Sequence, residues 1–214
     1  MNSLFEAIQK GDLHQIESLI KGDPKIINSV GETGLGIVAT AIYNNEPEIA
    51  RWLIQKGTPV TFHEHCALGN LLEVKNILTN QPDLINQFSV DGYQALGLAA
   101  FFGQSEVAEY LIKEGAEVNT PSKNPMAVRP LHSAVAAQHM RISELLLEAG
   151  AEVDCFQKDG YTPLHEAAGN GQLEMVQLLL CFGAKKDVHL SDGRTPLDLA
   201  REKGNGEVSV LIEK

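Results

Sequence analysis

"DGYTPLHEAAGNG", residues 159–171, places a turn, a helix start and a helix stop within one short stretch. Its Asp-Gly pair indicates a tight turn, because glycine accepts backbone angles that other residues avoid. Thr162 is placed to cap a helix that begins at the following proline, a residue favoured in a first helical turn. The glycine after the alanine pair then interrupts the helix. The stretch predicts a short helix over residues 163–170, bounded by turns.

The same pattern recurs along the chain at a nearly constant spacing. Steps of 33 residues separate Leu131, Leu164 and Leu197, and Leu96 lies 35 residues before Leu131. A second helix is predicted in each unit; over residues 172–181 its apolar residues fall on one helical face. Equivalent spacing elsewhere indicates seven units, whose anchor positions are Leu4, Val38, His63, Leu96, Leu131, Leu164 and Leu197.

A unit of two short helices cannot bury its apolar face alone, so neighbouring units must stack around a continuous core. "DGYTPLHEAAGNGQLEMVQLLLCFGA" and "DGRTPLDLAREKGN" closely resemble the ankyrin repeat, whose hallmark is Thr-Pro-Leu-His followed by an alanine pair. The resemblance extends over essentially the whole chain. It implies an all-α repeat solenoid of about seven stacked helix-turn-helix units with short β-hairpin-like turns, including N- and C-terminal caps.

We expect one ankyrin-repeat domain over residues 1–214, forming a complete array. The expected units are approximately 1–28, 29–59, 60–86, 87–119, 120–154, 155–187 and 188–214. The step from Val38 to His63 is 25 residues, so a linking turn is missing and an irregular junction is expected near residue 60. A two-residue insertion is expected within 123–127.

Composition narrows the functional classes. The formal net charge of −11 disfavours nucleic-acid binding, which depends on basic residues. The sequence lacks an apolar run of the ~18 residues that a membrane span needs, and its start does not resemble a secretion signal. Three scattered cysteines, Cys66, Cys155 and Cys181, do not make a disulfide framework. We expect a cytoplasmic protein with reduced thiols, without membrane insertion and monomeric when isolated.

The residues that suggest catalysis or metal binding have a structural interpretation. The sequence indicates no partner nucleophile or acid for His132 and His165, and the family resemblance implies that these imidazoles bond to the turn. "HEHC", residues 63–66, offers zinc-type ligands, but neighbouring side chains on a helix point in different directions. The glycines of "GETGLGIV" and "GNGQLE" are interpreted as repeat punctuation. We expect no catalysis, no cofactor and no metal site.

The resemblance implies that function resides at positions the scaffold leaves free, namely the turn tips and the open side of each first helix. These positions together line a concave groove in the family. Seven of the twelve aromatic residues of the chain map there. Clustered exposed aromatic residues commonly mark interaction sites. The predicted partner-binding residues are Tyr43, Phe88, Tyr93, Phe101, Phe102, Phe156, Tyr161 and Asn170.

The leading hypothesis is a non-catalytic module that binds a protein or peptide in this groove. The alternative is a regulatory or inhibitory subunit that blocks an enzyme or transporter. A less favoured hypothesis is a metal-dependent protein that uses residues 63–66. The resemblance also marks Asn86 and Asn119 as positions where ankyrin repeats can be hydroxylated.

Overall fold

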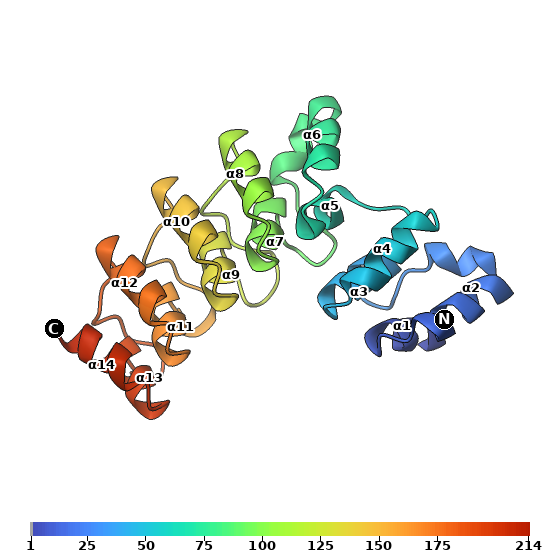
Figure 1. The fold of residues 1–214 in the computed structure, drawn as a ribbon. Coiled ribbons are helices and arrows are strands. Elements are labelled where there is room, and N and C mark those ends of the chain that lie inside the picture. Colours follow the sequence, from blue (N-terminus) through green and yellow to red (C-terminus); the bar gives the residue numbers. More distant parts are fainter. Residues whose placement is uncertain (1) are drawn as a thin grey trace.

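The structure is a computed structural model that describes residues 2–214. Its helices form consecutive antiparallel pairs, and each pair is one unit of the stack (Figure 1). The helices are α1 Asn2–Gln9, α2 Leu13–Gly22, α3 Ile37–Tyr43, α4 Pro47–Gln55, α5 Phe62–Leu68, α6 Leu71–Asn80, α7 Ala95–Phe101, α8 Ser105–Lys113, α9 Pro130–Ala136, α10 Met140–Glu148, α11 Pro163–Gly169, α12 Leu173–Cys181, α13 Pro196–Glu202 and α14 Gly206–Glu213.

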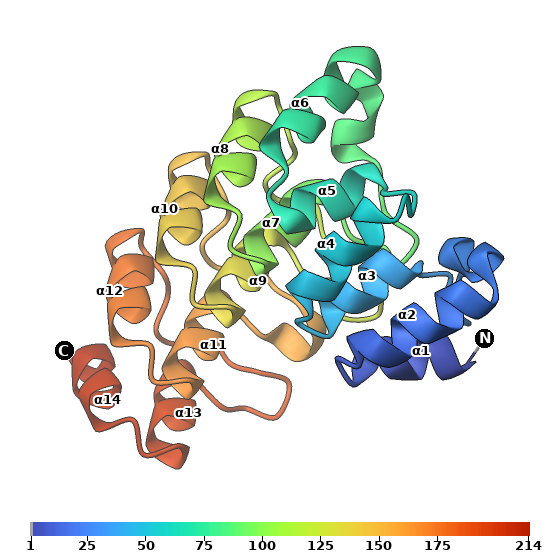
Figure 2. The same cartoon turned by 45° about the vertical axis from the view of Figure 1, so that its right-hand side comes forward.

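The pairs are stacked side by side along an arc, with the two ends of the chain at opposite ends of the stack (Figures 1 and 2). From α5 onward the odd-numbered helices form one row and the even-numbered helices form the other. Within residues 2–214 the turns contain isolated β-bridges, Val30 with Gly36 and Phe88 with Gln94, rather than strands. The predicted all-α repeat solenoid is confirmed. No helix of this part of the chain combines the length and apolarity that crossing a bilayer requires.

Local sequence signals explain where the helices begin. The Thr162 side chain accepts a hydrogen bond from the backbone N–H of His165, at 3.3 Å, and Thr162 Oγ1 lies 2.7 Å from His165 Nδ1. The predicted bonding of this imidazole to the turn is therefore observed. The same reciprocal capping occurs between Thr61 and Glu64 in α5. Such capping boxes satisfy backbone donors that would otherwise lack partners at the helix start.

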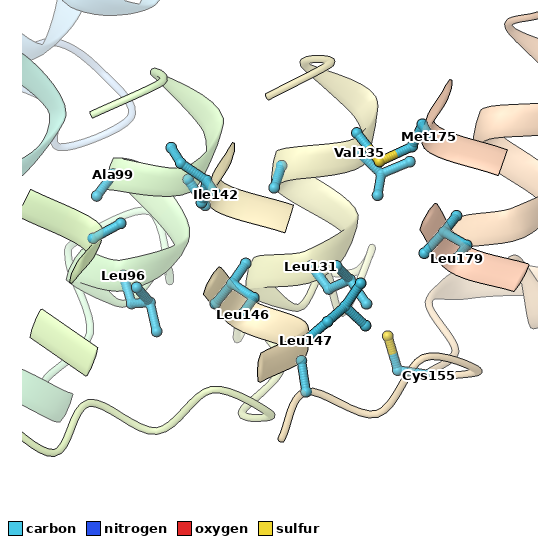
Figure 3. Packing of buried hydrophobic residues seen from close by; sticks show 14 of the residues in the cluster. Leu96, Ala99, Leu131, Val135, Ile142, Leu146, Leu147, Cys155, Met175 and Leu179 are labelled. Atoms are coloured by element: carbon cyan, nitrogen blue, oxygen red, sulfur yellow. The ribbon is translucent and has the colours of Figure 1, made fainter. Parts of the chain in front are cut away.

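The core is continuous through the stack. Leu96, Leu131 and Leu164 are at most 1% exposed, and alanines on the odd-numbered helices let neighbouring helices approach closely. Figure 3 shows side chains of successive units filling the space between the helices. One cluster of buried residues runs from α5 to α14, and a second covers α1 to α4 with contributions from α5 and α7. The two clusters meet at the third and fourth units.

Polar contacts tie adjacent units together along the turns. The side-chain oxygens of Asn86, Asn119 and Asp154 accept backbone N–H groups 31 or 33 residues further along, over 2.8–2.9 Å. From the fifth unit onward, each turn also donates one backbone N–H to the turn before it, over 2.8–3.0 Å. Asn86 and Asn119, which the resemblance marks for hydroxylation, therefore serve here as links between units.

The junction between the second and third units is irregular. Residues 56–61 connect α4 to α5 without a hairpin-like turn. Among the described residues, no backbone hydrogen bond of the kind that joins the later turns links these two units. The turn of the fourth unit instead contacts the turn of the second unit. If Gly34 carried a Cβ, that atom would lie only 2.7 Å from Val90 Cγ1. Gly34 has a φ of 84°. The Tyr43 hydroxyl donates a hydrogen bond to Asp91, 48 residues later, and spans the same gap.

The core contacts predict how stability responds to truncation. Leu131→Ala removes a side chain that is 1% exposed and leaves a cavity between units, so we expect a loss of about 2–5 kcal/mol. Leu72→Ala is the control, because that leucine is 70% exposed, and it should change stability by less than about 0.5 kcal/mol. Urea unfolding followed by circular dichroism measures both. Equal losses would contradict the stacked core.

Candidate partner-binding groove

Two adjoining pockets lie where the turns meet the odd-numbered helices. The first, which we call the hairpin-gap pocket, has a volume of about 210 Å³. The second, which we call the Gly97 pocket, has a volume of about 360 Å³. Tyr43 and Leu98 line both pockets and form their common wall.

The hairpin-gap pocket exists because the third unit lacks a hairpin. Its sides are the hairpins of the second and fourth units, and the start of α5 lies between them. Thr61, His63 and Glu64 come from that helix start. The remaining lining residues are Gly34, Leu35, Gly36, Ala39, Ile42, Tyr43, Ala67, Phe88, Ser89, Val90, Asp91, Leu98 and Phe102.

The Gly97 pocket results from a missing side chain. Gly97 occupies the position of α7 that carries His132 in α9 and His165 in α11, and a Cβ placed on it would have no atom within 4 Å. The helix thus leaves open the space that an imidazole fills in other units. The other lining residues are Tyr43, Tyr93, Leu98, Phe101, Val128, His132, Ser133, Ala136 and Gln157.

The structure brings five of the seven predicted aromatic residues to these pockets, namely Tyr43, Phe88, Tyr93, Phe101 and Phe102. Phe102 lies edge-on to Tyr43, with ring centroids 5.7 Å apart, and edge-on to Phe101 at 5.1 Å. Edge-to-face contacts of this kind are favourable and hold the rings in fixed orientations. The Tyr43 ring is held further by its hydrogen bond to Asp91.

Of the seven rings at positions that the scaffold leaves free, three are exposed and four are partly covered. Tyr43, Phe101 and Phe156 are exposed, at 39%, 47% and 55%. The four partly covered rings are Phe88, Tyr93, Phe102 and Tyr161. Neighbours far away in the sequence explain the difference: the Lys123 ammonium, for example, lies 4.1 Å from the Phe88 ring centroid.

The other predicted residues lie apart from the two pockets. Tyr161 lines a separate pocket of about 390 Å³ between the turns of the last three units. Phe156 is exposed at a turn and lines none of these pockets. Asn170 donates a hydrogen bond from its amide to Glu166 Oε1, over 2.7 Å, at the end of α11. The pockets also contain residues that were not predicted to bind a partner, such as Gly97 and Glu64. For Gly97, the sequence signal was a glycine at the position where the fifth and sixth units carry a histidine.

Buried ionisable groups near the groove are poorly suited to catalysis. His132 Nδ1 lies 3.6 Å from Cys155 Sγ, and His132 Nε2 lies 3.1 Å from the backbone oxygen of Tyr161. Burial raises the pKa of the Cys155 thiol to about 12 and lowers the pKa of His132 to about 4. A nucleophilic cysteine requires a thiol pKa lowered below its ordinary value. This pair therefore fits the core rather than a catalytic dyad.

The "HEHC" side chains have separate partners. His63 Nε2 lies 2.9 Å from the Gln87 oxygen, His65 Nδ1 lies 3.2 Å from the Asn70 amide, and Cys66 is fully buried in the core. Burial lowers the pKa of both histidines and raises the pKa of the thiol. Within residues 2–214 no group of three histidine, cysteine or carboxylate side chains is arranged to hold a metal ion.

Comparison with known proteins agrees with this architecture. A family model described as ankyrin repeats, in three copies, matches residues 4–122, 62–159 and 131–214. The chain is an ankyrin-repeat protein.

Relatives of this ankyrin-repeat protein differ in length. A probable 26S proteasome regulatory subunit p28 of Saccharomyces cerevisiae is 27% identical over 174 residues, which cover 74% of this chain and 75% of the yeast protein. A putative ankyrin repeat protein of fowlpox virus is 28% identical over 71% of this chain, and one of Rickettsia felis is 29% identical over 71%. The matches span 36% of the viral protein and 53% of the rickettsial protein.

The buried imidazole of His132 predicts a pH dependence of stability in this ankyrin-repeat protein. Its folded pKa, about 4, lies below its ordinary 6.5, so its contribution is fully present above pH 6.5 and is lost as the pH falls toward 4. At about 1.36 kcal/mol per pKa unit the change is on the order of 3 kcal/mol. Urea unfolding of the native chain and His132→Asn should show a stability difference that shrinks over this interval. A difference that is independent of pH would contradict this assignment.

The glycine that opens the second pocket should reduce the stability of α7. Gly97→Ala adds a methyl group where a Cβ meets open space, and alanine is favoured over glycine inside a helix by about 1 kcal/mol. We therefore expect the variant to be more stable than the native chain by up to about that amount. Thermal and urea unfolding measure the difference. A less stable variant would show that the space beside Gly97 is not open.

Proposed function

We propose that this ankyrin-repeat protein binds a protein or peptide partner in its groove and has no catalytic activity or cofactor of its own. One observation carries the proposal: two adjoining pockets share a wall formed by Tyr43 and Leu98, and five aromatic side chains line them. Aromatic residues are common anchors at protein interfaces, and pockets beside them can accept side chains of a partner.

The packing around these rings supports recognition by a preformed surface. Tyr43 is held by Asp91, and Phe102 is held between Tyr43 and Phe101. A surface whose side chains are already ordered loses less conformational entropy when it binds. Tyr161 and Phe156 belong, in this proposal, to an outer part of the contact surface, together with Asn170.

Other parts of the proposal rest on the chemistry of the chain. Cys66, Cys155 and Cys181 are all unpaired. Free thiols are typical of the reducing cytoplasm, which is where we place the protein. We propose that the isolated chain is a monomer, with no role in nucleic-acid binding, since its net charge is −11.

Capture of partners from a host lysate tests the groove. Phe101→Ala removes a ring that is 47% exposed at the Gly97 pocket, whereas Phe182→Ala removes a ring that is 40% exposed at the end of α12. Both variants should retain the native circular dichroism spectrum, because neither ring is buried. Partners captured by the native chain should be lost with Phe101→Ala and retained with Phe182→Ala. Equal capture by all three proteins would contradict the proposal.

A regulatory subunit is the second candidate function. The observation that favours it is the similarity to the yeast protein named a probable 26S proteasome regulatory subunit, which this chain matches over 75% of its length. The contacts would be those of the groove. The difference lies in the consequence, because binding would then block or alter the activity of the partner.

A further inference from the structure

The charged side chains that line the hairpin-gap pocket are acidic. Two carboxylates, Glu64 and Asp91, line it, and among the described residues no lysine or arginine does. The imidazole of His63 also lines it, and burial lowers the pKa of this group below its ordinary value, which favours the neutral form. Lys123 lies over the Phe88 ring but is not part of the lining.

Glu64 has an unused acceptor in this pocket. It is 9% exposed, and its Oε2 accepts the backbone N–H of Thr61 over 2.6 Å as half of the capping box. Oε1 has no hydrogen-bond partner among the described residues, and it lies 3.9 Å from the position of a Cβ on Gly36. A carboxylate on a largely buried residue, with one oxygen lacking a donor, favours a ligand that supplies one.

Asp91 adds a second carboxylate to the pocket, but its oxygens do not need a hydrogen-bond donor from the ligand. Its two oxygens accept hydrogen bonds from the hydroxyls of Tyr43 and Ser89. These neutral donors hold the carboxylate in place without placing a positive charge against it. Two fixed negative charges thus face one small pocket.

The rest of the pocket is apolar. Leu35, Ala39 and Ile42 line it together with the rings of Tyr43 and Phe102. Its volume, about 210 Å³, exceeds the ~150 Å³ of cavities known to hold a benzene molecule. Lysine and arginine side chains bury an apolar stem and keep a charged head in a polar environment, which matches apolar walls around a carboxylate.

We propose that the hairpin-gap pocket receives one lysine or arginine side chain of the partner, with its charged head on Glu64 and its stem against the apolar wall. The inference rests on the proposed function, because the same partner segment occupies the Gly97 pocket with an apolar side chain. The site exists because the third unit lacks a hairpin-like turn, which would otherwise fill the space between the turns of the second and fourth units. An acidic side chain is disfavoured there by both carboxylates, and a purely apolar one leaves Glu64 Oε1 without a donor.

A peptide selection tests the proposal with a defined probe. Random peptides displayed on phage are selected on the native chain, and clones that lose binding to Phe101→Ala are kept as groove-dependent. These clones should share a lysine or arginine at one fixed position. A synthetic peptide of the consensus is then compared with a peptide carrying citrulline in place of arginine, or glutamine in place of lysine.

The matched protein variants separate charge from folding. Glu64→Gln preserves the capping box, since glutamine serves at this position as well as glutamate does. Asp198→Asn is the control, because Asp198 has the same capping role in α13, outside the pocket. Glu64→Gln should weaken the basic peptide by about tenfold or more, as expected for a charged hydrogen bond, and leave the neutral peptide unchanged. Asp198→Asn should bind both peptides as the native chain does.

Three results would overturn the inference, in two distinguishable ways. Groove-dependent peptides without a fixed basic residue, or a basic peptide unaffected by Glu64→Gln, would refute the basic side-chain site and leave the groove intact. A selection that yields no groove-dependent peptide would refute the proposed function and the inference together.

Discussion

The stacked structure follows from one constraint: a single helix pair cannot bury its own apolar face. A pair of short helices offers too little internal contact, so burial is achieved against the next pair along the chain. Leu96, Leu131 and Leu164, at equivalent positions, are therefore almost completely removed from solvent. The buried alanines on the odd-numbered helices follow from the close approach that this stacking requires. The glycines between paired helices, such as Gly103 and Gly171, instead have the positive φ that the turn needs.

The regular stack makes its departures conspicuous. The third unit lacks a hairpin, and the fourth unit has Gly97 where other units have a larger side chain. The first departure removes a turn and the second removes a side chain, and a pocket lies at each of these two positions in the groove. Tyr43 lines both pockets and bonds to Asp91 across the gap, so the residues that compensate for the missing hairpin also shape the candidate site.

Much of the fold could be predicted from the sequence because its signals are local. Thr162, the proline after it and Gly171 mark a helix within a few residues, and α11 ends within one residue of the prediction. The missing turn near residue 60 was visible as a short spacing. The site was less accessible, because its geometry depends on contacts between distant units. The bond from Tyr43 to Asp91 spans 48 residues, and the cover that Lys123 places over Phe88 depends on how two turns meet.

The measurement that tests the central claim most directly is a crystal structure of the chain with a bound partner segment. The account predicts side chains of the partner in both the hairpin-gap pocket and the Gly97 pocket, on either side of Tyr43. A segment bound to the even-numbered helices, with both pockets empty, would contradict it.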